Sequence, residues 1–206
     1  GDTDPHLAGA FACSGLTAYS ALKKGAPYLA NNKVIIIGAG GVGMMALQIA
    51  KAAFNCNPIV IDIDDEKLNV ALENGASATF NSKNENVMQE IIQHTGGGAL
   101  NAIDFVGSEL SVNFGINLLV KGGKYVIVGL HGGEFKFPLP LIPIMERDIQ
   151  GSYVGSPGDM SELMALVRQN KIDPIPLQAR DASEASKTLM DLKNGKILGR
   201  ASLVHS

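Results

Sequence analysis

The sequence lacks the excess of positive charge found in nucleic-acid-binding and membrane-binding proteins, and it lacks the cysteines of disulfide-rich proteins. Lysine and arginine number 17 against 20 aspartates and glutamates, so the formal charge of -3 leaves no excess of cations for a nucleic acid or an anionic membrane surface. The two cysteines, Cys13 and Cys56, are too few for a disulfide framework and form no CxxC pair. We therefore expect no nucleic-acid partner, no membrane partner and a reduced, cytoplasmic setting.

Long apolar runs and repeats are also missing. The most apolar stretch, residues 34–53, is interrupted by four glycines and by Gln48 and Lys51, so it does not predict a membrane-spanning helix. The N-terminus is acidic and lacks the basic region that opens a signal peptide. Glycine is abundant instead, at 24 of 206 residues against an average of ~7%, and its clusters predict tight turns where the backbone approaches another group closely.

Short β-branched runs alternate with helical patterns from residue 33 onward. This alternation is typical of successive βα units and predicts an α/β fold, a doubly wound parallel sheet of the Rossmann type. Most of the runs are too apolar to have a solvated face, as expected of strands covered by helices on both sides. The predicted strands are 33–37, 58–61, 78–80, 102–106, 124–128 and 149–153.

Helices are predicted between these strands from apolar spacing and from capping residues. Asn55 is a tolerable left-handed stop, and Asp64 or Asp65 can cap the next helix. Asp159 and Glu162 have the capping-box offset, and Ser183 can cap the last helix. The predicted helices run through 42–53, 67–72, 87–92, 110–119, 163–167 and 189–192, and glycines at 75, 96–98, 122–123 and 195 follow four of them.

Two segments fall outside the alternation. Residues 5–31 form a helical stretch rich in small side chains. Residues 135–145 contain three prolines, whose missing N–H donors forbid a central strand and suggest an edge strand or a connector. We expect an N-terminal helical segment over 1–31, a dinucleotide-binding domain over 32–176, and a C-terminal helix and strand over 177–206.

The segment from Ile35 to Gly43 has the order strand, glycine turn, helix. A lone GxGxxG is weak evidence, but here it directly follows a strand and opens an amphipathic helix. Gly38 would allow the tight turn, Gly40 the approach of a pyrophosphate, and Gly43 close packing of the helix on the strand. The first N–H groups of the helix and its dipole would receive the phosphates. The predicted loop contacts are Gly38, Gly40, Gly41, Val42 and Gly43.

An acidic residue ends the next strand, at Asp62. Its carboxylate would accept hydrogen bonds from both hydroxyls of the adenosine ribose, and its charge would repel a 2′-phosphate. The following residue is Ile63 and not an arginine, while Lys67 lies one turn into the next helix and could reach the same ribose. The sequence therefore predicts binding of NAD in preference to NADP.

The other cofactor contacts are expected where later strands end, because ligands of open parallel sheets lie beyond the strand carboxyl ends. Val42 would lie against the nicotinamide ring. For any single apolar residue in this set, a place in the ordinary core is an equally good interpretation. The expected contacts are Phe105 and Val106 at the adenine, and Val128, Leu130, Ser152 and Val154 at the nicotinamide amide.

Several motifs together resemble the nucleotide-binding half of the medium-chain, zinc-dependent alcohol dehydrogenases. The resemblance extends over essentially all 206 residues. The motifs that carry it are 12–19, 38–43, Asp62 with Lys67, 103–108, 151–155 and the pair Gly199–Arg200.

The resemblance implies roles for three further residues. Cys13 matches a ligand of the catalytic zinc, Thr17 matches a threonine that touches the nicotinamide, and Arg200 matches an arginine that contacts the cofactor pyrophosphate. It also implies hydride transfer from an alcohol to NAD, with an alcohol or aldehyde as substrate. Family members pair through an edge strand, which would fall at 135–140 here, so a homodimer or tetramer is expected.

The sequence departs from the family in its extent. The family places a GroES-like catalytic domain first, and this chain begins after it. A catalytic zinc needs three protein ligands and an open position, and only Cys13 has a counterpart here. The four histidines show no metal-binding spacing with it. We expect a truncated chain that binds NAD without turning over alcohol alone, with zinc present only in the full-length enzyme.

Other functions stay open at this point. The chain could come from a zinc-free quinone or enoyl reductase of the same superfamily, although Cys13 and Asp62 argue against that branch, or it could be a non-catalytic NAD-binding module. Tyr19 and Lys23 have the YxxxK spacing of short-chain dehydrogenases, but they precede the glycine loop, whereas that family places the pair after it. His131 follows a strand end and could approach the nicotinamide, but an exposed loop residue is the better interpretation. Cys56 is interpreted as a packing residue.

Overall fold

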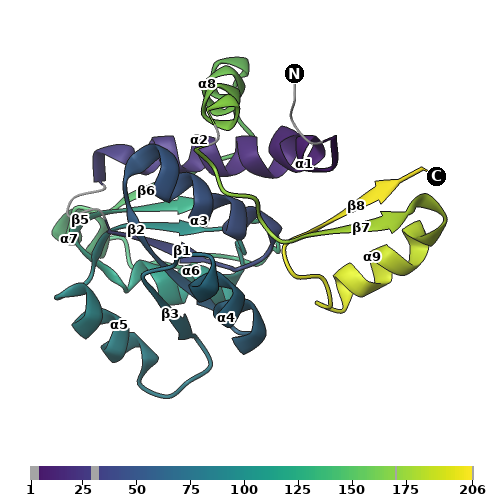
Figure 1. Cartoon of the computed structure of the whole chain (residues 1–206). Helices are drawn as coiled ribbons and strands as arrows, with labels where there is room; N and C mark the ends of the chain where they lie inside the picture. Colours follow the sequence, from purple (N-terminus) through teal and green to yellow (C-terminus); the bar gives the residue numbers. More distant parts are fainter. Residues whose placement is uncertain (1–4, 29–32, 170, 206) are drawn as a thin grey trace.

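The computed structural model describes residues 5–28, 33–169 and 171–205 (Figure 1). Its centre is a parallel sheet of six strands in the order β3-β2-β1-β4-β5-β6. The order reverses direction between β1 and β4, which is the switch point where ligands of doubly wound sheets bind. The strands are β1 Lys33–Ile37, β2 Asn57–Asp62, β3 Ala78–Asn81, β4 Ala99–Asp104, β5 Leu119–Ile127 and β6 Asp148–Gly151.

Helices cover both faces of the sheet, as the apolar strands predicted. The helices between the strands are α3 Gly41–Phe54, α4 Asp65–Glu73, α5 Val87–Thr95, α6 Glu109–Ile116 and α7 Leu141–Met145, and α8 Pro157–Arg168 follows β6. Residues before the sheet form α1 Pro5–Ala10, the π-helical turn η1 Phe11–Gly15, α2 Leu16–Gly25 and the 3-10 turn η2 Ala26–Tyr28. Among the described residues, no helix has both the length and the apolarity that a membrane span requires.

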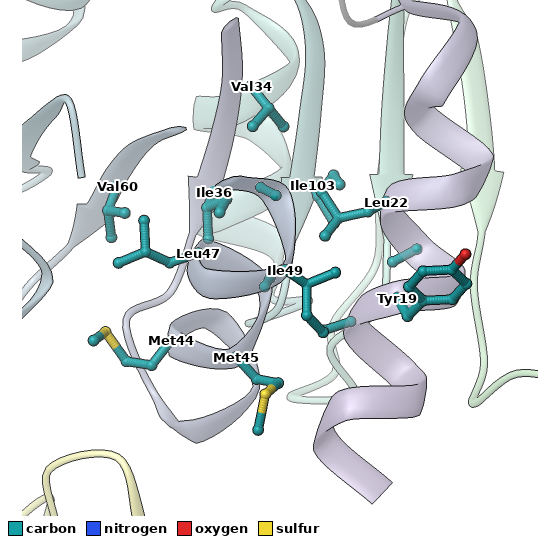
Figure 2. Packing of buried hydrophobic residues seen from close by; sticks show 14 of the residues in the cluster. Tyr19, Leu22, Val34, Ile36, Met44, Met45, Leu47, Ile49, Val60 and Ile103 are labelled. Atoms are coloured by element: carbon teal, nitrogen blue, oxygen red, sulfur yellow. The ribbon is translucent and has the colours of Figure 1, made fainter. Parts of the chain in front are cut away.

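Alternate residues of the strands fill two separate cores. Ile36 of β1 packs in the core under α2 and α3, together with Leu22 and Ile49 (Figure 2). Ile35 and Ile37 point to the opposite face and join the core under α5 and α6. This two-sided burial follows from the period of two along a strand. The predicted doubly wound α/β fold is confirmed.

The C-terminal segment forms a small unit of its own beside the sheet. β7 Leu177–Asp181 and β8 Arg200–Val204 pair in parallel, connected by the 3-10 turn η4 Ala182–Glu184 and α9 Ala185–Lys193. Helix α1 contacts both strands, and Figure 1 shows the unit on the side of the molecule where α1 lies. The sequence predicted one strand and one helix here; the second strand, β7, was missed.

The predicted helix over 110–119 was wrong in its last three residues. Helix α6 ends at Ile116, and Leu119 opens strand β5, which continues through the two glycines expected to stop the helix. Leu118 and Leu119 are buried in the core under α5 and α6, whereas Leu110 is 82% exposed. The spacing of these leucines fits a helix, but a short apolar run fits a buried strand equally well.

Two predicted helix caps were also wrong. Ser156 caps α8: its hydroxyl accepts a hydrogen bond from the Asp159 N–H at 3.1 Å, and the Asp159 carboxylate accepts from the Ser156 N–H at 2.9 Å. Asp159 is therefore the N3 residue that ends the capping box and not its start. Asp181 accepts hydrogen bonds from the N–H and hydroxyl of Ser183, so Ser183 lies inside a 3-10 turn before α9.

The proline-containing segment is a connector. Residues 135–140 form no strand in the part of the chain that the structure describes, and the helix α7 follows them. Phe135 and Phe137 stack on each other with ring centroids 5.5 Å apart. The residues at 29–32, which include the expected boundary between the first two segments, lie outside the described residues.

Candidate functional site

The turn between β1 and α3 requires glycine at two positions. Gly38 has φ +96°, and a Cβ there would lie 2.9 Å from Cγ2 of Val106. A Cβ on Gly43 would overlap the Gly38 carbonyl oxygen, so the helix can pack this close to the strand only with glycine. The Gly38 N–H donates to the Ile61 carbonyl at 2.7 Å, which fixes the turn to β2.

Gly40 lies in open space. A Cβ built on it meets no heavy atom within 4 Å, and its φ of -73° is ordinary for any residue. The fold itself therefore makes no demand for glycine at this position. A ligand that approaches the main chain here would make that demand, as a pyrophosphate does in dinucleotide sites.

The N-terminus of α3 is aimed at the same space. The N-cap is Gly40, which has no side chain to cap the helix, and the first intrahelical bond runs from the Met44 N–H to the Gly40 carbonyl at 2.8 Å. The N–H groups of the first turn thus lack intrahelical acceptors, and the helix dipole adds positive potential there. Val42 lies in this first turn and is partly exposed. The arrangement suits an anion such as a phosphate.

Asp62 lies beside the loop at the end of β2. Its Oδ2 accepts a hydrogen bond from the Ala39 N–H at 2.6 Å, and its Oδ1 accepts from the Ile63 N–H at 2.7 Å. The same Oδ1 also accepts from the Asp64 N–H at 3.2 Å. A carboxylate has about four acceptor positions, so three backbone N–H groups leave part of this capacity for a ligand hydroxyl. Lys67 is on α4 as predicted, but its ammonium lies 3.7 Å from Asp64.

Arg200 reaches the glycine loop from β8. A Cβ on Gly41 would lie 2.5 Å from Arg200 Nε, so the last strand and the loop are in contact. This Nε is buried and has no hydrogen-bond partner in the described structure. The arginine also lines a cavity of about 290 Å³ together with Cys13 and Ser14. A cation is thus held next to the turn where the helix N–H groups are unpaired.

Cys13 lies on the π-helical turn η1, and its side chain is exposed. Thr17 follows one turn later on α2 and is partly buried. No group of three histidine, cysteine, aspartate or glutamate residues that could hold a metal ion occurs among the residues described. The described residues alone therefore do not fit a three-ligand zinc site, and the assignment of Cys13 as a ligand stays a prediction.

Asp104 organises the neighbouring strand end and was missed by the sequence analysis. The residue is fully buried at the end of β4; its Oδ1 accepts from the N–H groups of Val106 and Gly107, at 2.8 and 2.9 Å. Its Oδ2 accepts from the Ser111 hydroxyl at 2.7 Å and the Tyr125 hydroxyl at 3.1 Å. Burial, and next the neighbouring Asp104 carboxylate, raise the pKa of the Tyr125 hydroxyl, which therefore stays protonated and donates.

The other predicted contacts lie along the same edge of the sheet. Phe105 and Val106 directly follow β4 and are partly buried, while Val128 is 8% exposed and belongs to the core. The Val128 N–H donates to the Asp104 carbonyl, so its own carbonyl oxygen is the backbone group left for a ligand. Leu130 is 80% exposed in the next loop.

Two predicted residues follow β6. The Ser152 N–H donates to the Ile127 carbonyl at 2.8 Å, and its hydroxyl accepts from the Lys24 ammonium at 2.8 Å. Val154 is partly exposed and has φ +50°. Which of these strand-end residues contact a cofactor remains a prediction.

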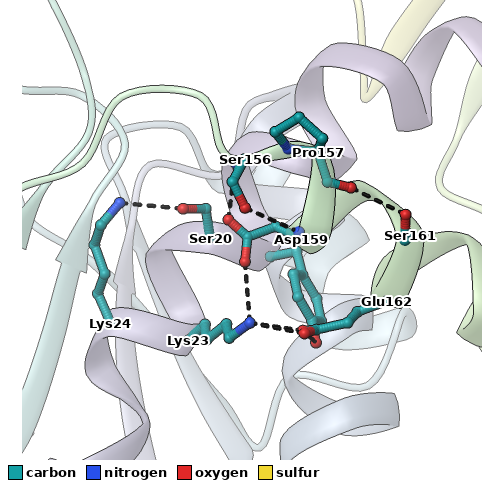
Figure 3. A network of polar contacts seen from close by, with 9 residues as sticks. Ser20, Lys23, Lys24, Ser156, Pro157, Asp159, Ser161 and Glu162 are labelled. Carbon is teal, nitrogen blue, oxygen red and sulfur yellow. Dashed lines mark hydrogen bonds and ion pairs between the residues drawn. The ribbon is translucent and has the colours of Figure 1, made fainter.

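Residues suspected of other chemistry have structural partners. The Tyr19 hydroxyl donates to Glu162 at 2.7 Å, and Lys23 forms ion pairs with Asp159 and Glu162 (Figure 3). This pair therefore joins α2 to α8. Burial raises the pKa of the Cys56 thiol to about 11, which suits a packing residue.

Comparison with known proteins agrees with this geometry. The chain is 36% identical over 193 residues to an NAD-dependent alcohol dehydrogenase of Sulfurisphaera tokodaii, which covers 93% of this chain and 56% of the relative. It is 37% identical over 195 residues to the enzyme of the same name from Sulfolobus acidocaldarius, with 92% of this chain and 55% of the relative covered. The chain thus spans about half the length of the curated relatives it matches.

A solved structure shows the same fold. The alcohol dehydrogenase of the hyperthermophilic archaeon Aeropyrum pernix superposes with a TM-score of 0.87 at 34% identity, over 95% of this chain and 56% of that chain. The family model described as zinc-binding dehydrogenase matches residues 41–169. That range includes α3, the acidic residue at the end of β2 and every strand of the sheet after β1. The chain therefore belongs to the zinc-binding dehydrogenase family.

Proposed function

We propose that this chain is the NAD-binding part of an alcohol dehydrogenase. The observation that carries the proposal is the open space at Gly40, next to the uncapped N-terminus of α3. The fold itself does not require glycine at this position. Asp62 accepts a hydrogen bond from the residue before Gly40, and Arg200 lies against the residue after it. A dinucleotide needs this combination: donors and a cation for its diphosphate, and an acceptor for its ribose.

Each residue has a distinct task in this proposal. The N–H groups of the first turn of α3 hold the diphosphate, with Arg200 as counter-ion. Asp62 binds the ribose hydroxyls and disfavours a 2′-phosphate, so NAD is preferred to NADP. Bound NAD supplies the hydride acceptor, and the protein orients it. Thr17, the carbonyl of Val128 and the segment after β6 would fix the nicotinamide end.

The substrate of the whole protein is proposed from its relatives. NAD-dependent alcohol dehydrogenases are the curated relatives, so an alcohol or aldehyde is the substrate class that we infer. Zinc would need ligands beyond the described residues, with Cys13 as one of them. We expect the present chain to bind NAD and to oxidise no alcohol by itself.

Self-association is proposed at the β6 edge of the sheet. The residues around α7, which precedes this strand, include Leu139 and Ile144, with exposures of 76% and 60%. We propose that two copies bury this apolar surface, giving a dimer or a tetramer. Sedimentation of the chain should show a species of at least twice the monomer mass; a monomer at high concentration would contradict the proposal.

Calorimetric titration of the chain with NAD, NADP and ADP-ribose tests the function. We expect NAD and ADP-ribose to bind, and NADP to bind at least about tenfold more weakly because its 2′-phosphate meets Asp62. Preference for NADP would favour the reading as a quinone or enoyl reductase. Absence of heat with both NAD and ADP-ribose at millimolar concentration would refute the proposed function.

A further inference from the structure

The segment after β6, residues 152–156, has an unusual backbone at its centre. Val154 has φ +50°, in the left-handed region. A β-branched residue is an outlier there, because its branched side chain crowds the backbone. Contacts elsewhere in the molecule must hold the segment in this conformation.

One face of α2 lies along this segment. Leu16, Ser20 and Lys24 are spaced four residues apart and therefore lie on one side of the helix. A Cβ on Gly155 would lie 2.6 Å from Leu16 Cδ1 and 3.1 Å from Ser20 Cβ, so the segment approaches the helix as closely as glycine allows. These contacts fix the end of the segment that follows Val154.

Lys24 fixes the end that precedes Val154. Its ammonium donates to the Ser152 hydroxyl at 2.8 Å and to the Ser20 hydroxyl at 3.1 Å, and both serines are buried (the Ser20 contact is drawn in Figure 3). In the part of the chain that the structure describes, Lys24 forms no ion pair with a carboxylate. The partly buried Lys24 ammonium thus donates hydrogen bonds to two neutral acceptors.

The adjacent lysine shows a different arrangement. Lys23 has a half-exposed side chain and pairs with Asp159 and Glu162 on α8 (Figure 3). Lys23 therefore joins two helices, whereas Lys24 joins α2 to the segment at the sheet edge. Thr17, which we place at the nicotinamide, is on the same helix as both lysines.

We propose that Lys24 is a positioning residue for the nicotinamide end of the cofactor site. It holds Ser152 against α2, and together with the Gly155 contact it keeps Val154 in the left-handed conformation that directs the backbone of residues 152–154 toward the cofactor. The proposal rests on the proposed function, since it assigns the nicotinamide to this segment. Lys24 itself touches no reacting atom in this account.

The test compares two ligands that differ in one group. ADP-ribose contains every part of NAD except the nicotinamide. In the Lys24→Met chain, affinity for NAD should fall by roughly fivefold to twentyfold, because the hydrogen bond that the charged Lys24 ammonium donates to Ser152 is lost. Affinity for ADP-ribose should change less than about twofold. Calorimetry of both ligands on each variant gives the ratio directly, and a merely structural role would weaken both alike.

Three further variants sharpen the result. Lys24→Arg keeps a cationic donor and should restore most of the NAD affinity. Ser152→Ala should match Lys24→Met, and the double variant should lose no more than either single one, since both substitutions remove the same contact between Lys24 and Ser152. Lys23→Met is the matched control, and it should leave the NAD to ADP-ribose ratio at the wild-type value.

Hydrogen exchange in the free chain provides a readout that needs no ligand. The amides of residues 153–156 should exchange faster in Lys24→Met than in wild type or Lys23→Met. An unchanged affinity ratio in Lys24→Met overturns the proposal, as does an equal loss for both ligands. If the wild-type chain binds neither ligand, the proposed function fails; unchanged exchange in Lys24→Met would then overturn the role of Lys24 independently.

Discussion

Two segments at the carboxyl edge of the sheet reach unusual backbone conformations by different means. The loop 38–43 uses glycine where φ is positive and where the backbone approaches closely, at Gly38 and Gly43. The segment 152–156 places a valine at φ +50°. It is held against α2 by the hydrogen bond from Lys24 and by the contact of Gly155 with Leu16. The first is shaped by its own residues and the second by residues distant in sequence.

The two segments should therefore differ in which substitutions they tolerate. In the loop, a side chain at Gly38 or Gly43 would meet a neighbouring group of the fold, whereas a side chain at Gly40 would enter open space. In the second segment the conformation costs free energy, of order 1–3 kcal/mol for a non-glycine residue in this region, and tertiary contacts offset it. Substitutions on α2 should therefore act on a site that α2 flanks.

The largest effect is expected from Gly40→Val. The side chain would enter the empty space at the loop and displace the diphosphate, so NAD affinity should fall by at least about 100-fold through loss of charge-assisted hydrogen bonds. Since φ at this residue is ordinary, the free energy of unfolding should change by less than about 1 kcal/mol. Calorimetry and denaturant unfolding measure the two quantities.

Gly43→Ala is the matched control in the same loop. Its Cβ would overlap the Gly38 carbonyl, so this variant should lose about 2–4 kcal/mol of stability before any question of binding arises. Equal stability of Gly40→Val and Gly43→Ala would contradict the assignment of Gly40 to ligand binding and of Gly43 to helix packing.

Asp62→Asn should have the next largest effect. It keeps the size of the side chain and one acceptor oxygen but removes the charge, so NAD affinity should fall by roughly tenfold while NADP loses less or gains. The ratio of the two affinities, measured on one preparation, is the readout. An unchanged ratio would show that this carboxylate does not face the ribose.

Val154→Gly tests the second segment directly. Glycine adopts positive φ without steric cost, so the variant should gain about 1 kcal/mol in the free energy of unfolding despite the added chain entropy. Val70→Gly in α4 is the comparison and should lose about 1 kcal/mol, since that residue is helical. A loss of stability in Val154→Gly would mean that its side-chain packing outweighs its backbone conformation.

The smallest effect concerns the contact between α2 and α8. Hydrogen bonds from the backbone of Ser156, and then from Lys23, hold the pKa of Asp159 below its usual range; a hydrogen bond from Lys23 does the same for Glu162. This stabilisation is complete above the carboxyl pKa values of the unfolded chain, about 4, and is lost as pH falls through the lower folded values.

The melting temperature should therefore fall more steeply in wild type than in Lys23→Met between about pH 4 and pH 2. Both proteins should melt alike in 1 M salt, which screens exposed charges. Parallel pH profiles at low salt would show that the ion pairs contribute nothing measurable.

The sequence predicted those features that depend on neighbouring residues. The strand, the glycine turn and the helix lie within 33–54, and Asp62 ends the next strand, so local pattern was enough to place the loop beside an acidic group. The two-sided burial of the sheet was also predictable, because β1 and β2 are apolar at every interior position.

Features that depend on tertiary contacts could not be predicted in this way. Leu118 and Leu119 have helical spacing, and only the core under α5 and α6 decides that Leu119 opens a strand. The role of Asp104 was missed because the sequence does not show which backbone N–H groups a buried aspartate will bond. Lys24 could not be singled out from the sequence, since its partner Ser152 is 128 residues away along the chain.

The contact between Arg200 and Gly41 has a consequence for synthesis. A ribosome makes the chain from its N-terminus, so the first βαβ unit can form while the later strands of this sheet are untranslated. Arg200, the cation of the proposed diphosphate site, is translated only with β8, after the whole six-stranded sheet. A nascent chain arrested before β8 leaves the exit tunnel should therefore fold its sheet and still hold the dinucleotide weakly.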